Sequence, residues 1–376
     1  MLFKVFNKFL PKTLSIILIF IKKKIYKNKQ SKSILFIVEF PQSFSSFKSI
    51  INSFKKITDK QFIQIIILKN SNYNKVHKSN FENLLDYNQF NIINEDEIQS
   101  SYNYIFIHNP YDIERPNSLS FQKLYFKCNK IIYLSYGIEI AGGRKLTQFN
   151  MPSQRYSDYV FVHSESAKSQ YKKYCSTGDN HVYALGHPSY DEIKFNSNDI
   201  ENNYFLWCPH HSVSEENNDL STFLIYDQKI YNYFKNNTSK TLCIRPHPML
   251  RKKLNDMGNN YSQRLNKLLS LNNIYEDTTN DYTSTFEKSI ALVSDASSFL
   301  MIYPLLKKPM LFLKNLKGPE LGDDGVFFKD CTATGWDELK FFLDNGYLNK
   351  EYIINLDHEI INIGCAGREI VNFLKK

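Results

Sequence analysis

Residues 33–40 read SILFIVEF, a run in which apolar side chains, several of them β-branched, follow one another almost without interruption. A strand with one face in water alternates apolar and polar residues, so a continuous run indicates a strand that is buried on both faces. Such strands form parallel sheets that are covered by helices on both sides. This stretch therefore indicates an α/β fold.

Similar runs recur along the chain, with segments between them that are long enough for helices. In the first half they occupy residues 61–68, 102–108, 130–136, 159–163 and 181–185. The alternation of strand-like runs and helix-length segments is typical of doubly wound sheets, which bind ligands at the carboxyl ends of their strands.

The pattern stops at a polar stretch, residues 194–203, which we interpret as a linker, and then restarts. The later strand-like runs are residues 204–208, 240–244, 290–294 and 309–313. Helices are predicted over 214–236 and 261–271, and a last apolar-periodic stretch at 359–374 predicts a C-terminal helix.

A chain of 376 residues is about twice the length of a typical domain, so two domains are expected. We predict two doubly wound, Rossmann-like α/β domains facing a cleft, at residues 31–195 and 200–350. Residues 1–30 form a separate segment, and residues 355–376 a C-terminal helix for which packing back on the first domain is one option.

The positive charge of the chain lies in its N-terminal segment. The net charge is +9, and residues 1–30 contain eight lysines and no acidic residue, which leaves +1 on the rest. A nucleic-acid-binding protein needs a basic surface on its folded body, so nucleic acid is excluded as a partner. The six cysteines are far apart and contain no C-x-x-C pair, so we predict no metal site.

The N-terminal segment has the composition of a membrane-surface helix. Residues 13–21 are apolar but too few to cross a bilayer, which takes about 20 residues. Lys4, Lys8 and Lys12 share one face of a helix, opposite apolar side chains, which suits attraction to anionic lipid. We therefore predict a peripheral protein at an anionic membrane surface; the alternative is an ordinary first helix packed on the body.

The segment Ile244-Arg245-Pro246-His247-Pro248 ends a predicted strand. Two prolines exclude a helix and leave a stiff, extended exit, in which residues two apart point the same way. Arg245 and His247 are therefore expected to project together. A guanidinium beside an imidazole suits a phosphate group, because the first binds its oxygens and the second transfers protons near neutral pH.

Two other strand exits in the second half carry polar side chains. Cys208-Pro209-His210-His211-Ser212 follows one strand, and because adjacent residues of an extended chain face opposite sides, only one histidine is expected to enter the site. Ser294-Asp295-Ala296-Ser297-Ser298 joins another strand to an apolar run that Pro304 should kink or shorten.

Such a strand-to-helix turn directs backbone N–H groups outward, and we predict that Asp295, Ser297 and Ser298 contact a phosphate there, with helix capping as the alternative. The three exits are expected to converge on one anion-binding pocket.

A glycine-containing loop follows the strand 130–136 in the first half. Tyr136, Gly137, Gly142 and Gly143 are candidate contacts for an acceptor or a donor, because glycine permits close approach of the backbone to a ligand. The spacing matches neither the G-x-G-x-x-G fingerprint nor a P-loop.

Four of these segments together resemble the CDP-glycerol glycerophosphotransferase family, whose members are GT-B-type enzymes of teichoic-acid and capsule assembly. They are RPHP at 245–248, SDASSFLMIYPLLKKPMLFL at 294–313, GHPSYDEI at 186–193 and YGIEI at 136–140. The resemblance covers about residues 130–315. It implies a GT-B-like fold with an N-terminal acceptor domain and a C-terminal donor-nucleotide domain, acting at the cytoplasmic face of the cell membrane.

The resemblance also implies a reaction and roles for residues. An acceptor hydroxyl would attack the β-phosphorus of the donor, releasing CMP. His247 would be catalytic or phosphate-binding, and Arg245, Ser297 and Ser298 would contact the donor phosphates. The chain departs from the family at Tyr136, where a histidine is common and serves as a proposed base, and at Ile302, where an acidic residue is common.

We therefore expect transfer of a polyol phosphate from a CDP-activated donor to a lipid-linked or capsular glycan, with no cofactor. His247 or His210 would handle the acceptor proton, with His211 as a further candidate contact. Two alternatives stay open: a GT-B glycosyltransferase that uses a nucleotide sugar, and a non-catalytic, membrane-associated scaffold.

Overall fold

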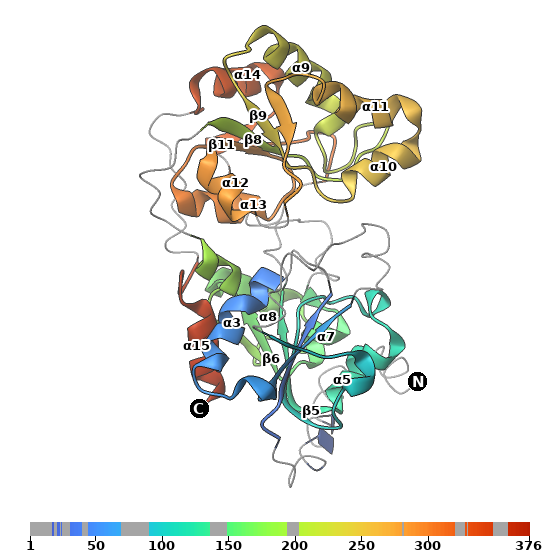
Figure 1. Cartoon of the computed structure of the whole chain (residues 1–376), viewed down its shortest axis with the longest axis vertical. Coiled ribbons are helices and arrows are strands. Elements are labelled where there is room, and N and C mark those ends of the chain that lie inside the picture. The colour runs from blue at the N-terminus through green and yellow to red at the C-terminus, as the bar shows by residue number, and fades with distance from the viewer. Residues whose placement is uncertain are drawn as a thin grey trace. The chain divides into compact units, whose positions relative to one another are not determined.

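The computed structural model describes residues 17–18, 21–22, 24, 31–39, 44–68, 90–135, 149–193, 203–279, 282–319, 328, 330–348 and 360–376. The chain divides into two compact units (Figure 1). Unit 1 comprises residues 1–138, 144–193 and 357–376, and unit 2 comprises residues 139–143 and 194–356.

Unit 1 is built on a seven-stranded sheet with the strand order β3-β2-β1-β4-β5-β6-β7, in which all neighbours run parallel. The strands are β1 (Ile34–Val38), β2 (Ile63–Ile67), β3 (Asn91–Ile92), β4 (Tyr102–Ile107), β5 (Cys128–Leu134), β6 (Tyr159–Val162) and β7 (Val182–Ala184). The chain moves outward from β1 to β3 and then crosses back to β4. The direction of winding therefore reverses between β1 and β4, the point at which doubly wound sheets bind ligands.

Helices cover both faces of this sheet. The α-helices of unit 1 are α3 (Ser45–Lys55), α5 (Phe121–Tyr125), α7 (Pro152–Tyr156), α8 (Glu165–Tyr174) and α15 (Ala366–Leu374). Short 3-10 helices are η2 (Lys60–Phe62), η3 (Glu95–Glu97), η4 (Asp112–Glu114), η5 (Asn117–Leu119) and η6 (Pro188–Glu192). One apolar core lies under α3 and α15, and the other lies under α5, α7 and α8. Strands buried on both faces explain the uninterrupted apolar runs of the sequence.

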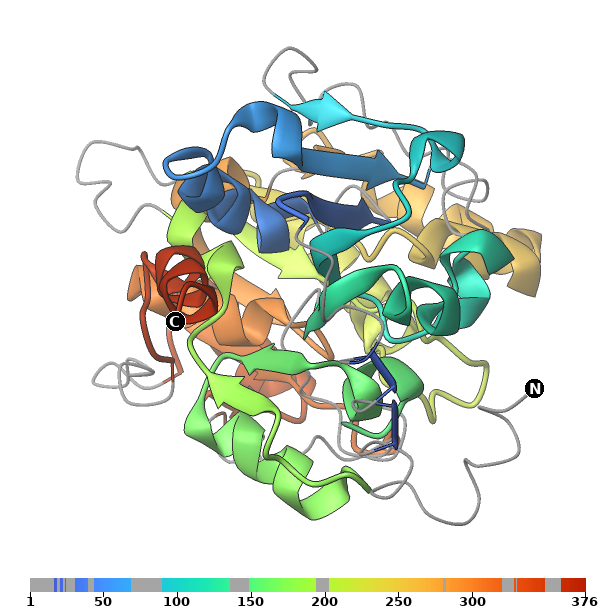
Figure 2. The same cartoon turned by 90° about the horizontal axis from the view of Figure 1, so that it is seen from below.

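The C-terminal helix α15 packs directly on α3, as Figures 1 and 2 show. A Cβ atom at Gly367 would lie 2.7 Å from the backbone nitrogen of Ile50, so only glycine permits this approach. The Asp191 carboxylate accepts hydrogen bonds from the backbone N–H groups of Ala366 and Gly367, at 2.9 and 2.8 Å. These contacts attach the end of the chain to unit 1.

Unit 2 repeats the same topology on a six-stranded parallel sheet with the order β10-β9-β8-β11-β12-β13. The strands are β8 (Tyr204–Cys208), β9 (Leu242–Ile244), β10 (Ile274–Glu276), β11 (Ser289–Ser294), β12 (Met310–Leu313) and β13 (Thr332–Ala333). The winding reverses between β8 and β11. The helices are α9 (Phe223–Asn236), α10 (Leu250–Met257), α11 (Asn259–Leu268), α12 (Thr283–Lys288), α13 (Phe299–Ile302), the 3-10 helix η7 (Tyr303–Leu306) and α14 (Trp336–Asn345).

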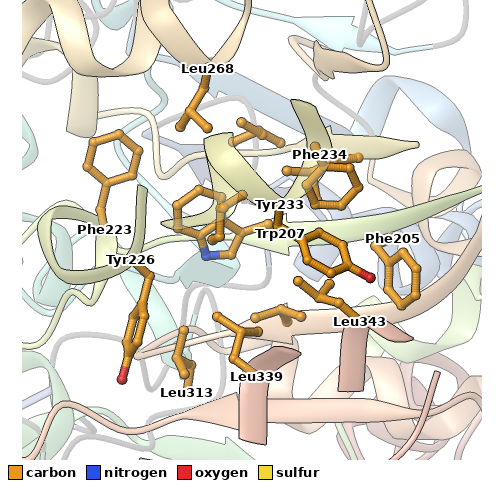
Figure 3. Packing of buried hydrophobic residues seen from close by; sticks show 14 of the residues in the cluster. Phe205, Trp207, Phe223, Tyr226, Tyr233, Phe234, Leu268, Leu313, Leu339 and Leu343 are labelled. Carbon is orange, nitrogen blue, oxygen red and sulfur yellow. The ribbon is translucent and has the colours of Figure 1, made fainter. Parts of the chain in front are cut away.

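The main core of unit 2 surrounds Trp207 on β8, which is 1% exposed (Figure 3). The indole stacks on the ring of Phe223 at a centroid distance of 5.5 Å. Leucines from α11 and α14, among them Leu268 and Leu339, complete this core. Strand β8, which is followed by His210 and His211, is therefore fixed in its position by large buried rings.

The structure confirms the predicted fold class, two doubly wound parallel α/β units. Each predicted strand is present. The described residues contain three further strands (β3, β10 and β13), which are two or three residues long and too short to form an apolar run. The predicted helix 214–236 begins only at Phe223, because the preceding backbone folds toward Asp295. Pro304 shortens the helix as predicted, since α13 ends at Ile302 and continues as η7.

The described part of the N-terminal segment packs on unit 1. Leu18 is 7% exposed and belongs to the core cluster. The ammonium group of Lys22 is buried and pairs with the Asp158 carboxylate at 2.5 Å, whereas Ile17 and Ile21 are exposed. Among the described residues of this segment, Leu18 and Lys22 therefore pack on the body, as in the alternative of an ordinary first helix. Among the described residues, no helix is both long and apolar enough to cross a bilayer.

Candidate functional site

The winding reversal of unit 2 brings two of the predicted site segments together. Cys208 at the end of β8 lies opposite Ser294 at the end of β11, and the Ser294 hydroxyl donates to the Cys208 carbonyl at 2.8 Å. The segments after these strands, which begin at Pro209 and Asp295, therefore start side by side. This is the edge at which a doubly wound sheet binds its ligand.

Asp295 organises this edge from within. Its side chain is buried, with 1% of the residue exposed. One carboxylate oxygen accepts from the backbone N–H groups of His210 and Ala296, at 2.7 and 2.8 Å. The other accepts from the N–H and hydroxyl of Thr222 and from the Ser221 hydroxyl.

Because both oxygens of Asp295 bind donors of the protein itself, the side chain positions the histidine segment and the start of α9. The direct phosphate contact predicted from the sequence for Asp295 stays a prediction. Burial raises the pKa of Asp295 to about 6, although the backbone N–H groups lower it.

Three histidine rings meet at the same edge. The ring centroids of His211 and His247 lie 4.2 Å apart, those of His210 and His211 also 4.2 Å, and those of His210 and His247 5.4 Å. We call His210, His211 and His247 the histidine trio. The expectation that adjacent histidines face opposite sides is wrong here, because residues 209–211 lie outside any strand and the chain turns at Val213, whose N–H donates to the His211 carbonyl.

Backbone pairing explains how His247 reaches the other two. The N–H of Arg245 donates to the Trp207 carbonyl at 2.8 Å, and the N–H of His247 donates to the Pro209 carbonyl at 3.0 Å. The extended exit of β9 thus continues alongside the exit of β8. All three histidines are half-buried, so their rings are sheltered but not sealed.

The ring nitrogens of two histidines have defined partners. The Nδ1 of His210 accepts from the backbone N–H of Ser212, and the Nδ1 of His247 accepts from that of Met249, both at 3.1 Å. Burial, together with the neighbouring His211, lowers the pKa of His210 to about 3. At neutral pH His210 is therefore uncharged.

Arg245 contacts the other neighbouring strand. Its Nη1 donates to the Asp277 carboxylate at 2.5 Å and to the Thr279 hydroxyl at 3.2 Å. Although burial favours the neutral acid, Arg245 and nearby hydroxyls hold the pKa of Asp277 below its usual range. Arg245 and His247 thus leave β9 toward different neighbours, β10 and β8, and the charge of Arg245 is partly matched by Asp277, which the sequence argument missed.

Ser297 and Ser298 begin a very short helix. The Ser297 hydroxyl accepts from the backbone N–H of Phe299 at 3.2 Å, and Ser298 is the residue preceding α13. Because α13 has only four residues, few aligned peptide dipoles add to a positive end there. Ser297 therefore binds the first N–H of α13, Ser298 makes no side-chain cap bond, and the phosphate contact of both stays a prediction. Tyr136, Gly137, Gly142 and Gly143 lie outside the described residues.

Unit 1 has a polar cluster at its own winding reversal, which the sequence argument also missed. Arg115 donates to the Glu39 carboxylate at 2.6 Å and to the Asp112 carboxylate at 2.5 Å, and its side chain is fully buried. His108, after β4, accepts from the backbone N–H of Glu39 at 3.1 Å. Burial raises the pKa of Glu39 to about 7, against the opposing effect of Arg115. The sequence signal that could have indicated this cluster is Glu39, a charged residue directly after the buried strand β1.

The histidine trio could hold an ion on geometry alone. One ring nitrogen from each histidine lies within 4.8 Å of the others, and among the described residues no other group of three potential metal ligands does so. The prediction that only one of these adjacent histidines enters the site was based on their facing opposite sides, which the ring contacts overturn.

Two doubly wound parallel units, each with its polar groups at the winding reversal, define a GT-B fold. No protein-family model matches the sequence, and a search of the curated proteins finds no match. Solved structures do match, and three of them are compared with this chain below.

A structure of the wall teichoic acid polymerase TagF has 15% sequence identity and a TM-score of 0.61, covering 97% of this chain and 96% of that one. The MnaA–UDP complex from S. aureus has 13% identity and a TM-score of 0.60, covering 91% and 96%. The UDP-GlcNAc 2-epimerase from Neisseria meningitidis, bound to UDP-GlcNAc, has 15% identity and a TM-score of 0.57, covering 92% and 100%. At these identities the likeness establishes the fold.

Proposed function

We propose that this protein is a transferase that moves a polyol phosphate from a CDP-activated donor to a lipid-linked or capsular glycan, releasing CMP. The observation that carries the proposal is the convergence of three imidazoles, with Arg245 on the adjacent strand exit, at the carboxyl edge of unit 2. The likeness to TagF, one structure of which was soaked with CDPG, supports a donor of this kind.

The reaction needs little covalent chemistry from the protein. The acceptor hydroxyl oxygen forms a bond to the β-phosphorus, the bond from that phosphorus to the CMP oxygen breaks, and CMP leaves with the electron pair. The hydroxyl proton passes to a base. Phosphoryl-type transfer is accelerated mainly by positioning and by stabilising charge on the phosphate oxygens, which imidazole N–H groups and Arg245 can supply.

The residues have different suitability for moving the proton. His210 is a weak base, because burial and His211 lower its pKa to about 3. Among the two histidines assigned from the sequence, His247 is therefore the better candidate. Asp295 holds the backbone of His210 and takes no direct part.

A glycosyltransferase that uses a nucleotide sugar is the second candidate. Several similar structures are UDP-GlcNAc 2-epimerases, and one of them is bound to UDP-GlcNAc. Ile302, where the glycerophosphotransferase pattern commonly has an acidic residue, also favours a different donor. A non-catalytic scaffold is the third, because Tyr136 stands where that pattern has its proposed base.

The donor decides between these candidates. The purified full-length protein is incubated with a lipid-linked glycan acceptor and, in parallel, with CDP-glycerol, CDP-ribitol and a panel of UDP-sugars, and nucleotide release is measured. CMP release only with a CDP-polyol is the expected result. Turnover only with a UDP-sugar would contradict the proposal and support the glycosyltransferase. Turnover with none of the donors would favour the scaffold.

We also propose that the protein acts at the cytoplasmic face of the cell membrane as a peripheral protein. The eight lysines of residues 1–30 support this, although Lys22 is used within unit 1, where it pairs with Asp158. Sedimentation with vesicles that contain anionic lipid, compared with neutral vesicles, tests the attraction. Equal binding to both would contradict it.

A further inference from the structure

The connection from β8 to α9, residues 209–222, is irregular backbone, yet it carries His210 and His211. Asp295 holds this connection near its two ends, through the backbone N–H groups of His210 and Thr222. A connection of this length has many conformations unless further contacts fix its middle. The position of the two histidines therefore depends on what supports the residues between these ends.

Asn315, two residues after β12, supplies that support. Its side chain is buried, with 7% of the residue exposed. The amide nitrogen donates to three carbonyl groups of the connection, which belong to Asn217, Asp219 and Ser221, at 3.0, 2.6 and 3.3 Å. The amide oxygen accepts from the backbone N–H of Lys317 at 3.0 Å. Both ends of the amide are therefore used, and asparagine combines two N–H donors with an acceptor in a side chain of this size.

A close backbone contact lies beside this amide. A Cβ atom at Gly318 would lie 2.4 Å from the carbonyl oxygen of Asp219, so only glycine permits the turn after β12 to approach the connection so closely. The N–H of Gly318 donates to the carbonyl of Asn315 at 3.1 Å, which closes the turn. Residues 315–318 therefore form a fixed turn that rests on residues 217–221.

The contacts of Asn315 continue to the imidazole of His210. Ser221, whose carbonyl accepts from Asn315, donates with its backbone N–H to the carbonyl of Ser212 at 3.1 Å. The N–H of Ser212 in turn donates to the Nδ1 of His210 at 3.1 Å. Asp295 thus holds the backbone of His210, whereas Asn315 supports the residue whose N–H binds its ring.

We propose that Asn315 is a positioning residue, which acts through Ser221 and Ser212 on the direction of the His210 ring. Because Asp295 follows β11 and Asn315 follows β12, the exits of β8, β11 and β12 are joined in one support. Only the identification of the group that His210 faces, a phosphate of the donor, rests on the proposed function. The support of the ring rests on hydrogen bonds within unit 2.

The direction of this ring matters in a site that works mainly by positioning. A displacement of a group by about 1 Å can lower the rate about 100-fold. If Ser212 were loosened, the ring of His210 could turn while its backbone stays bound to Asp295. We therefore expect the loss of Asn315 to change ligand binding as well as stability.

Unit 2 contains a matched control for Asn315 at the other edge of its sheet. Asn273, directly before β10, also donates to three carbonyl groups, which belong to Phe234, Asn237 and Lys240. Asn315→Leu and Asn273→Leu each remove one such amide without adding a charge. Both should lower the stability of unit 2 in denaturation followed by tryptophan fluorescence. A change that occurs only in Asn315→Leu then reports on position.

The ring of His210 gives the first measurement. In full-length protein with ¹⁵N-labelled histidine, long-range ¹H–¹⁵N spectra report the hydrogen bond at Nδ1, and His210→Ala assigns the signal. In Asn315→Leu the Nδ1 resonance of His210 should move toward that of a ring whose Nδ1 accepts no hydrogen bond, whereas Asn273→Leu should leave it at the wild-type position. An unmoved resonance in a folded Asn315→Leu protein would overturn the proposal.

Binding gives the second measurement, by calorimetry with inorganic pyrophosphate as the probe for the diphosphate of the proposed donor. Asn315→Leu should weaken binding roughly 5- to 10-fold, the effect of about one neutral hydrogen bond, and Asn273→Leu should bind like the wild type. Because Asn315 acts through His210, the same substitution in a His210→Ala protein should weaken binding by less than about 2-fold further. Equal losses in both backgrounds would show that Asn315 does not act through the ring.

Gly318→Ala tests the same support without touching the amide, and it decides if Asn315→Leu does not fold. The added Cβ atom would displace the turn from Asp219, so the His210 resonance should move in the same direction as in Asn315→Leu. Gly335→Ala is the control, because a Cβ atom there would meet no atom of the described residues within 4 Å. A resonance that moves in neither variant, or equally in both, would contradict the inference.

The outcomes separate this inference from the proposed function. A His210 resonance that depends on Asn315, in a protein that binds no pyrophosphate and turns over no nucleotide donor, would leave the positioning role standing and remove the transferase. Turnover of a CDP-polyol that Asn315→Leu leaves unchanged, together with an unmoved resonance, would do the opposite.

Discussion

The two sheets wind in the same way, yet the polar groups at their winding reversals are used differently. In unit 1, Glu39 and Arg115 neutralise each other and are buried, at 1% and 5% exposure. In unit 2, the buried acid Asp295 binds only donors of the protein itself, and the three histidines above it stay half-buried. Equivalent places in a shared topology therefore hold a buried ion-pair cluster in one unit and three half-buried imidazoles in the other.

This difference teaches how to recognise a ligand site at the end of a strand. A buried charge with all its partners inside the protein fixes the backbone, because leaving it unpaired costs several kcal/mol. A ring whose inner nitrogen is bound to the backbone and whose outer end is accessible is held in place for a ligand. We therefore expect substitutions in unit 1 to affect stability, and substitutions in the histidine trio to affect binding.

Arg115→Ala should give the largest effect and tests the structural half of this comparison. It leaves the buried Glu39 unpaired, so unit 1 should lose about 3–5 kcal/mol of unfolding free energy. Both tryptophans, Trp207 and Trp336, belong to unit 2, so their fluorescence follows that unit during denaturation, while circular dichroism follows both.

The expected result for Arg115→Ala is an earlier transition by circular dichroism with unchanged tryptophan fluorescence and unchanged pyrophosphate affinity. The double variant Glu39→Met, Arg115→Met removes both charges and should recover much of the loss. A fall in pyrophosphate affinity for a folded Arg115→Ala protein would instead give the cluster a part in the ligand site.

Acidification should separate the two units. Burial lowers the pKa of His108 and His163 to about 3 and of His187 to about 4. The stability that these neutral rings contribute is therefore present above about pH 6.5, the ordinary pKa of histidine, and is lost as the pH falls. Glu39, with a pKa raised to about 7, acts in the opposite sense: its contribution is full below its ordinary pKa and is lost as the pH rises through 7.

In unit 2, acidification destabilises the fold through His210 (pKa about 3) and stabilises it through Asp295 (pKa about 6). These two changes in stability nearly cancel between pH 6 and 4. Each uncompensated proton changes stability by about 1.4 kcal/mol per pH unit. Unit 1 should therefore unfold at a higher pH than unit 2. Circular dichroism should fall before tryptophan fluorescence in an acid titration, and the reverse order would contradict this account.

Much of this comparison follows from the sequence, and part of it could not. Apolar runs predict the long strands, and hence the doubly wound fold class, because strands buried on two faces leave that pattern. β10 has three residues and no run, so Asp277 behind it was missed. The meeting of His210 with His211 depends on a turn outside any strand. The backbone bonds to the Nδ1 atoms of His210 and His247 have no sequence signature.

Asp295→Asn tests whether the buried acid of unit 2 supports the histidine trio. The amide keeps one acceptor but places an NH₂ group against donors that both carboxylate oxygens now bind, so unit 2 should lose about 1–3 kcal/mol. Pyrophosphate affinity should fall as well, because the single amide oxygen cannot accept from the N–H groups of both His210 and Thr222, and the tryptophan-detected transition should move. An unchanged affinity at unchanged fold would show that Asp295 does not position the trio.

Thr222→Val is the smallest and most selective change. Thr222 is fully buried, and its hydroxyl donates to Asp295 at 3.1 Å, while its backbone N–H donates to the same oxygen at 2.8 Å. Valine has nearly the same shape and removes only the hydroxyl bond, so unit 2 should lose about 1 kcal/mol in tryptophan-detected denaturation. The bond between Asp295 and the N–H of His210 remains, so pyrophosphate affinity should change less than about 2-fold, well within the effect of one neutral hydrogen bond. A larger loss of affinity than of stability would mean that the hydroxyl, and not the backbone bonds, sets the position of the trio, and the division between a buried support and an exposed ligand site would have to be redrawn.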